Sequence, residues 1–76
     1  MKYQNKSMEN TIRVERAKKR ITQAELAKQV HVSRQTIHAI ENGKFVPSTL
    51  LALKIAGYFG VSVEDLFILE KSDLEK

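Results

Sequence analysis

The chain has 76 residues, enough for one domain, and a domain of this size removes only about 60% of its unfolded surface from water, so we expect marginal stability. Its 42% hydrophobic and 29% charged residues are typical of a globular protein, and the lack of cysteine excludes disulfides and thiolate metal sites. The net charge of +4 is asymmetric: ten Lys and Arg oppose four Asp and Glu in residues 1–47, whereas three oppose five in residues 48–76, and the basic half favours a polyanionic partner.

The beginning of the chain is polar and has no apolar segment of the kind found in signal peptides. The most apolar stretch, residues 46–63, is interrupted by Pro47, Ser48 and Lys54, which argues against a membrane span. We therefore expect a cytoplasmic protein with no membrane contact, in which residues 1–8 form a flexible N-terminal arm. Met8 offers an alternative translation start, and the sequence does not decide between Met8 and the first residue.

A first helix is predicted over residues 9–20, with acidic residues near its start, where the helix dipole favours them. Its apolar content is small and consists of Ile12 and Ala17. A second helix is better defined, because Thr22 followed by Glu25 is a capping-box pattern. The apolar residues of this second helix recur at helical spacing and are Leu26, Ala27 and Val30.

A third helix begins after a turn of only three residues, 30–32. Ser33 is a good N-cap for it, and Gly43 can adopt the left-handed conformation that often follows a helix end. On a helical wheel the inward side holds Thr36, Ile37 and Ile40. The outward side holds Arg34, Gln35, His38, Ala39 and Asn42.

Two further helices complete the pattern. Ser48 caps a fourth helix, which Gly60 ends, and Ser62 caps a short fifth helix. The inward residues of these two helices are Leu51, Ile55, Ala56, Phe59, Leu66 and Phe67. The C-terminal tail, residues 68–76, loses the pattern. No strand pattern occurs, so the fold class is all-α with five short helices.

Enzymatic function is not expected from this inventory of residues. The two histidines, His31 and His38, lie on different predicted elements, and no Gly-rich phosphate loop is present. We therefore predict no catalytic residues, no metal site and no cofactor.

The polar outer face of the third helix has two interpretations. Taken alone, such a face is typical of any helix exposed to solvent. Two capped helices joined by a short turn, however, form a helix-turn-helix, in which the second helix enters the major groove of DNA. Arg and Gln side chains match the edges of guanine and adenine in that groove, so the outward face could read DNA sequence.

Several motifs in register resemble the Cro/phage-repressor type of helix-turn-helix, also called the XRE family. They lie in "ITQAELAKQVHVSRQTIHAIENGKFVPS" and "LALKIAGYFGVSVEDLF", and the resemblance runs from about Ile12 to Phe67. It implies a compact five-helix lambda-repressor-like DNA-binding domain over residues 9–67, with the helix-turn-helix at about residues 23–42.

The resemblance also implies roles for individual residues. Those expected to contact base edges are Arg34, Gln35, His38 and Ala39, although Ala39 is equally well explained by helix propensity. Those expected to contact phosphates are Thr22, Gln23, Asn42 and Lys44. Arg13, Lys18 and Lys19 are better explained as a solvated face than as further phosphate contacts.

Arg16 and Glu41 correspond to an ion pair that joins the first helix to the recognition helix in the family. Arg16 follows Ile12 by one turn, on the side that should face the core, so its charge needs a partner. The chain departs from the family pattern in having His31 in the turn where Gly is usual, Glu15 in place of an apolar residue, and Leu50 in place of a polar one.

Together these features predict a sequence-specific regulator that binds double-stranded DNA, acting as a repressor and as a homodimer on a palindromic operator. The expected dimer surface comprises Leu50, Phe67, Ile68 and Leu69, while closure of the domain core explains Ile68 and Leu69 equally well. The alternative is an antitoxin-like protein that binds a small toxin through this apolar end and regulates its own operon.

Overall fold

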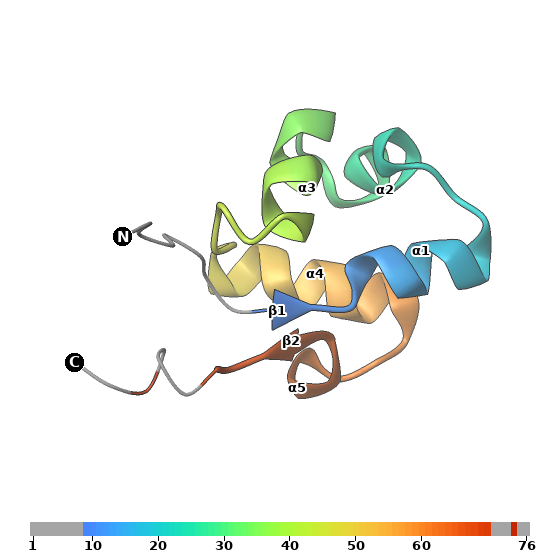
Figure 1. The fold of residues 1–76 in the computed structure, drawn as a ribbon. Coiled ribbons are helices and arrows are strands. Elements are labelled where there is room, and N and C mark those ends of the chain that lie inside the picture. Colours follow the sequence, from blue (N-terminus) through green and yellow to red (C-terminus); the bar gives the residue numbers. More distant parts are fainter. Residues whose placement is uncertain (1–8, 71–73, 75–76) are drawn as a thin grey trace.

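A computed structural model describes residues 9–70 and 74 of the chain (Figure 1). Within these residues the helices are α1 (Ile12–Lys19), α2 (Gln23–Val30), α3 (Arg34–Glu41), α4 (Thr49–Phe59) and α5 (Val63–Leu66). Two short strands, β1 (Glu9–Asn10) and β2 (Phe67–Ile68), flank them. The expected N-terminal arm, the alternative start at Met8 and most of the expected tail lie outside the described residues.

The helix starts that the sequence predicts for α2 to α5 are confirmed. In each case a Ser or Thr hydroxyl oxygen accepts the backbone N–H three residues later, at 3.0 or 3.1 Å. The four N-caps are Thr22, Ser33, Ser48 and Ser62. At Thr22 the capping box is complete, because the Glu25 carboxylate accepts the Thr22 N–H at 2.7 Å.

Left-handed residues end three of the helices. Gly60 ends α4 with φ of 72°, and His31 takes the same region after α2 with φ of 65°. The turn of the helix-turn-helix therefore forms with histidine where glycine is usual in the family, at some cost in backbone strain. Arg20 closes α1 in the same way, with φ of 57°, which the sequence did not indicate.

The sequence predicts a helix over residues 9–20 and no strand, and both predictions are wrong at residues 9 and 10. These two residues form β1, and the helix begins at Ile12. Glu9 and Asn10 pair antiparallel with Ile68 and Phe67, so β2 also crosses the boundary expected after Phe67. The Thr11 N–H donates to the Leu66 carbonyl at 2.9 Å, which fixes the backbone before α1. These bonds join opposite ends of the chain, and two-residue strands are too short to show a periodic pattern.

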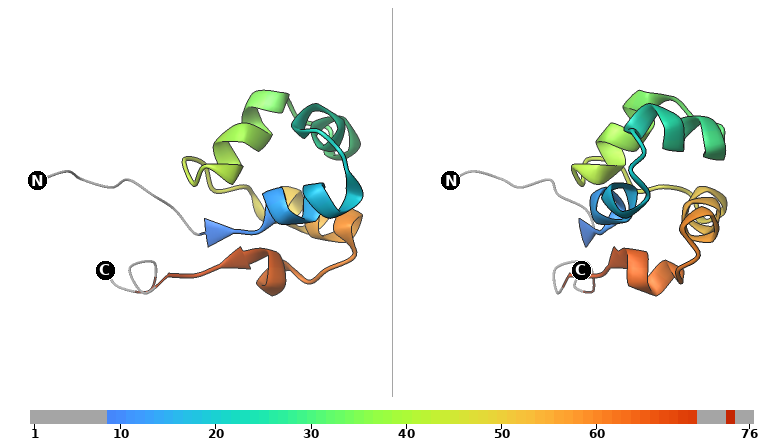
Figure 2. Two further views of the ribbon diagram at one scale, coloured as in Figure 1. Left: turned by 45° about the vertical axis from the view of Figure 1, so that its right-hand side comes forward. Right: turned by 90° about the vertical axis from the view of Figure 1, so that its right-hand side faces the viewer.

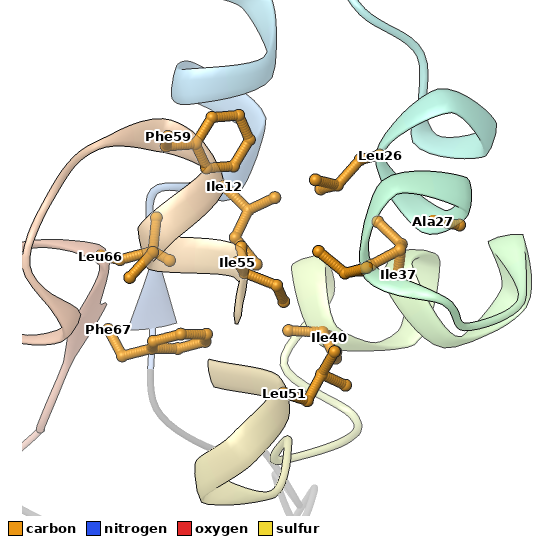
Figure 3. Packing of buried hydrophobic residues seen from close by; sticks show 12 residues of the cluster. Ile12, Leu26, Ala27, Ile37, Ile40, Leu51, Ile55, Phe59, Leu66 and Phe67 are labelled. Carbon is orange, nitrogen blue, oxygen red and sulfur yellow. The ribbon is translucent and has the colours of Figure 1, made fainter. Parts of the chain in front are cut away.

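One hydrophobic core joins all the helices. Its fully buried large side chains are Ile12, Leu26, Ile37, Ile40, Ile55 and Leu66 (Figure 3). Phe67 is only 7% exposed and points into this cluster, as predicted for an inward residue, so only a small part of its surface is available to the expected dimer contact. Ala17 is exposed, which leaves Ile12 as the buried apolar residue of α1.

The elements form three levels in the views of Figures 1 and 2. Helices α2 and α3 lie together on one side, α1 and α4 cross beneath them, and α5 with the two strands lies on the opposite side. The outer face of α3 is therefore directed away from the α5 and strand end of the domain.

Candidate nucleic-acid interface

Helix α3 is seated on the domain by two side chains and leaves the rest of its surface outside. Ile37 and Ile40 are fully buried, whereas Arg34 and Gln35 are exposed in the first turn. Within the described residues neither of these two exposed side chains makes a hydrogen bond or ion pair. Ala39 is half-buried and offers only part of its methyl group. The first turn of α3 thus presents the unengaged polar groups of the helix.

The beginning of α2 lies beside α3. Its capping box uses the Thr22 hydroxyl oxygen and backbone N–H, while the N–H groups of Gln23 and Ala24 have no partner inside the helix because they belong to its first turn. Free amides at a helix N-terminus favour an anion such as a phosphate. The Glu25 carboxylate occupies the N-cap amide and leaves these two amides available.

A buried ion pair fixes α3 relative to α1. Arg16 donates from Nε to the Glu41 carboxylate at 2.6 Å and from Nη2 at 3.2 Å, a two-pronged contact. A third Arg16 donor, Nη1, bonds the Ile21 carbonyl at 2.9 Å. The Arg16 side chain is 16% exposed and that of Glu41 is fully buried, so water does not screen the pair strongly.

Glu41 has two further donors besides Arg16. Gln23 Nε2 donates at 3.1 Å from the start of α2, and Arg13 Nε lies 3.4 Å away on α1. Burial by itself raises the pKa of Glu41, but the hydrogen bonds from Arg16 and Gln23, the positive charge of Arg16 and the Arg13 hydrogen bond together lower the pKa below its ordinary value. The carboxylate is therefore ionised at neutral pH and connects α1, α2 and α3.

The far end of α3 carries the remaining expected contact residues. Asn42 caps α3, and Gly43 and Lys44 follow in a Schellman turn, in which the Lys44 N–H donates to the Ala39 carbonyl at 2.9 Å. Asn42 and Lys44 are exposed. This turn places both side chains directly beyond the end of α3.

His38 does not stand free on the outer face of α3. Its Nδ1 lies 3.4 Å from Gln23 Nε2, and its Nε2 lies 3.0 Å from Asn42 Nδ2. The structure thus brings Gln23, His38 and Asn42 together, while Arg34 and Gln35 stand apart in the first turn of the same helix.

Two residues of the site were missed or underestimated in the sequence. Asn10 Nδ2 donates to the Ile40 carbonyl at 2.8 Å, and its Oδ1 accepts the Ile12 N–H at 3.2 Å, so it ties the start of α1 to the end of α3. Arg13, expected to be solvated, is 66% exposed but reaches Glu41 and, at 3.4 Å, the Asn42 Oδ1 atom. Both contacts depend on tertiary packing, and no local pattern indicates them.

The other basic residues of α1 are directed elsewhere. Lys18 lies 3.5 Å from Glu15, and the Lys19 ammonium lies 5.5 Å from the centre of the Tyr58 ring on α4. Neither contact belongs to the α3 face, so these two lysines are not part of the candidate interface.

Similarity to known proteins shows the family of this chain. A Helix-turn-helix family profile (HTH_3) matches residues 12–66, which is most of the chain and includes every element from α1 to α5. The chain belongs to the XRE-type helix-turn-helix family. It is therefore a DNA-binding transcriptional regulator of lambda-repressor-like fold, a class without enzymatic activity.

Individual relatives agree with this assignment. The chain is 53% identical over 66 residues to an uncharacterized HTH-type transcriptional regulator from Methanocaldococcus jannaschii, covering 87% of this chain and 100% of that protein. The structure of the SOS-response transcriptional repressor LexA from Eubacterium rectale matches with a TM-score of 0.71 at 29% identity, over 87% of this chain and 70% of that one. The restriction-modification controller protein C.AhdI from Aeromonas hydrophila matches with a TM-score of 0.67 at 27% identity, over 74% of this chain and 81% of that one.

Residues 9–70 and 74 contain neither a membrane-spanning helix nor a metal-binding cluster. None of the helices there has the length and apolar character that crossing a membrane requires. The same residues contain no group of three or more His, Asp or Glu side chains placed to hold a metal ion.

Proposed function

We propose that this regulator is a sequence-specific repressor that acts in the cytoplasm as a homodimer on a palindromic operator. The observation that carries the proposal is the unengaged first turn of α3, held at a fixed angle by the buried pair of Arg16 and Glu41. In the major groove Arg34 would donate to O6 and N7 of guanine, and Gln35 would pair with adenine. The methyl group of Ala39 is partly buried, so the only base contact it could make is with the methyl group of a thymine.

Phosphate contacts would lie on both sides of these base contacts. The start of α2, at Thr22 and Gln23, would bind one phosphate through helix amides, and the end of α3, at Asn42 and Lys44, would bind another. Such contacts set the register of α3 in the groove without reading sequence. They also make the affinity fall steeply with salt, because bound cations are released from the DNA.

An apolar groove supports the dimer. It has a volume of about 930 Å³ and runs from the loop after α3, at Val46, past Leu53 on α4, to β2. Ile68 and Leu69 at its edge are 45% and 57% exposed, and Phe67 contributes to its lining. Leu50, close by in sequence on α4, is 64% exposed. Since exposed apolar patches mark interaction sites, a second copy would cover this surface and present its own α3 about 34 Å away, one turn of DNA.

The similarity to LexA, whose name describes a transcriptional repressor, supports the repressor role. A bound dimer would exclude polymerase from an overlapping promoter. None of the three relatives reported above is named for a toxin or an antitoxin, so the antitoxin alternative has no support beyond the sequence.

Selection of bound sites from random duplex DNA tests the proposal. We expect a palindromic motif with half-sites separated by about one helical turn. A single, non-repeated motif would contradict the homodimer, and recovery of no motif would contradict sequence-specific reading.

A further inference from the structure

His38 occupies a position that differs from that of a base-reading residue. Its ring lies between the Gln23 amide at the start of α2 and the Asn42 amide at the end of α3, at 3.4 and 3.0 Å. An imidazole has only two ring nitrogens, and both of them face these amides. In this arrangement no ring nitrogen is left for the edge of a base.

The donor and acceptor atoms of these side chains determine which group donates the hydrogen in each contact. The Gln23 nitrogen donates one hydrogen to the buried Glu41 carboxylate at 3.1 Å, which fixes the orientation of its amide. The second hydrogen on that nitrogen faces His38 Nδ1, so Nδ1 accepts it. A neutral imidazole then carries its hydrogen on Nε2 and donates it toward Asn42.

This direction determines how Asn42 is oriented. An amide oxygen must accept the hydrogen of His38 Nε2, so the Asn42 amide turns its oxygen to the ring and its nitrogen away from it. In the structure the amide has the opposite orientation, with Nδ2 3.0 Å from His38 Nε2 and Oδ1 3.4 Å from Arg13 Nη2, so the exposed Asn42 side chain must make a half turn and lose the Arg13 hydrogen bond. The two N–H hydrogens of Asn42 then face outward, where they suit a phosphate oxygen.

The same accounting excludes the Gln23 side chain as a phosphate ligand. Both hydrogens on its nitrogen are engaged, by Glu41 and by His38, and its remaining oxygen can only accept. Phosphate oxygens also accept, so the two do not bond. A phosphate at the start of α2 would therefore be bound by backbone amides.

We propose that Gln23 and His38 are positioning residues that connect the buried Glu41 carboxylate to Asn42 and orient the Asn42 amide toward a DNA phosphate. The inference rests on the proposed DNA-binding face of α3. It departs from the role that the family resemblance implies for each of the two residues, because it assigns neither a base contact to His38 nor a side-chain phosphate contact to Gln23.

DNA binding by His38 variants tests the inference. His38→Ala should weaken binding about 3- to 10-fold for the selected operator and for every single-base variant of it alike, as expected for the loss of a hydrogen bond. His38→Gln, which can still donate to Asn42, should restore affinity to within about 2-fold of the wild type. Gln29→Ala, at an exposed position of α2, serves as the control and should change nothing.

Two further quantities should stay unchanged if Gln23 and His38 only stabilise the fold. They are the energetic coupling between His38 and Asn42 and the tautomer of the His38 ring. Asn42→Ala should weaken DNA binding less in the His38→Ala background than in the wild type, because the Asn42 amide is no longer oriented there. The double variant should therefore lose less affinity than the sum of the two single losses. Nitrogen NMR of the His38 ring at pH 8 should find the hydrogen on Nε2 in the wild type and a mixture of tautomers in Gln23→Ala.

The outcomes separate this inference from the proposed function. Relaxed preference at one base pair in His38→Ala, additive losses with Asn42→Ala, or an unchanged tautomer in Gln23→Ala would each overturn the inference. Failure of the wild-type protein to prefer any DNA sequence would overturn the proposed function instead.

Discussion

Arg16 and Glu41 lie 25 positions apart in the chain, yet Arg16 Nε approaches Glu41 Oε2 to 2.6 Å with the carboxylate fully buried. This pair fixes α3 on α1, and through Gln23 it also reaches the start of α2. Helices α1, α2 and α3 are therefore oriented around a single carboxylate.

Removing Arg16 should destabilise the fold strongly. Arg16→Ala leaves the Glu41 carboxylate buried without its main partner, a change that typically costs about 3–5 kcal/mol. The free energy of unfolding in urea measures the loss. Lys18→Ala is the matched control, because its contact with Glu15 is exposed and long, at 3.5 Å, and it should change stability by less than about 0.5 kcal/mol. Equal effects of the two variants would contradict the role of the buried pair.

The stability should depend on pH in the acid range through Glu41. Because the folded-state pKa of Glu41 is lowered, the unfolded chain binds this proton more readily than the folded one. The contribution is fully present above the unfolded pKa of about 4.3 and is lost as pH falls through the folded pKa. Urea midpoints between pH 3 and pH 7 should therefore fall on acidification in the wild type and fall less in Glu41→Gln. Parallel curves for the two proteins would show that Glu41 does not titrate in this way.

Gly57 inside α4 and Gly60 at its C-cap should respond in opposite directions to the same substitution. Gly60 has φ of 72° and open space around its Cβ position, so Gly60→Ala introduces backbone strain without a clash and should cost about 1 kcal/mol. Gly57 lies inside the helix, also in open space, so Gly57→Ala should stabilise by about 0.5–1 kcal/mol. Thermal unfolding measures both. Destabilisation by both variants would indicate steric contacts that the structure does not contain.

The sequence alone predicted the parts of the fold that depend on local chemistry. Serine and threonine caps and the apolar spacing placed α2, α3 and α4, since these features act within one or two helical turns. The start of α1 could not be predicted in this way, because pairing of Asn10 with Phe67 depends on residues at the other end of the domain.

In the candidate site, too, features that depend on local sequence could be predicted, and features that depend on tertiary packing could not. The outward position of Arg34 and Gln35 follows from helical periodicity, whereas the Arg16 and Glu41 pair was expected only from the family resemblance. The contacts of Gln23 with Glu41 and His38 could not be predicted, because they join side chains from two helices whose relative angle is set by packing.

Dimerisation should depend on the apolar groove. Leu69→Lys places a charge at a position that is 57% exposed, so it should prevent association without disturbing the core. Sedimentation at micromolar concentration should find a dimer for the wild type and a monomer for Leu69→Lys. Val14→Lys, at a position on α1 that is 53% exposed and outside the groove, should remain a dimer. A wild-type monomer, with or without operator DNA, would rule out the homodimer.

Base reading by α3 is the central claim, and comparison of Arg34→Ala with Lys44→Ala on the selected operator tests it most directly. Affinities are measured for the operator and for each single-base variant at several salt concentrations. Arg34→Ala should cost about 1–3 kcal/mol and lose discrimination at one base pair of each half-site. Lys44→Ala should weaken all sequences alike and reduce the salt slope by about 1. Wild-type affinity and wild-type base preference in Arg34→Ala would contradict the proposal that the first turn of α3 reads DNA.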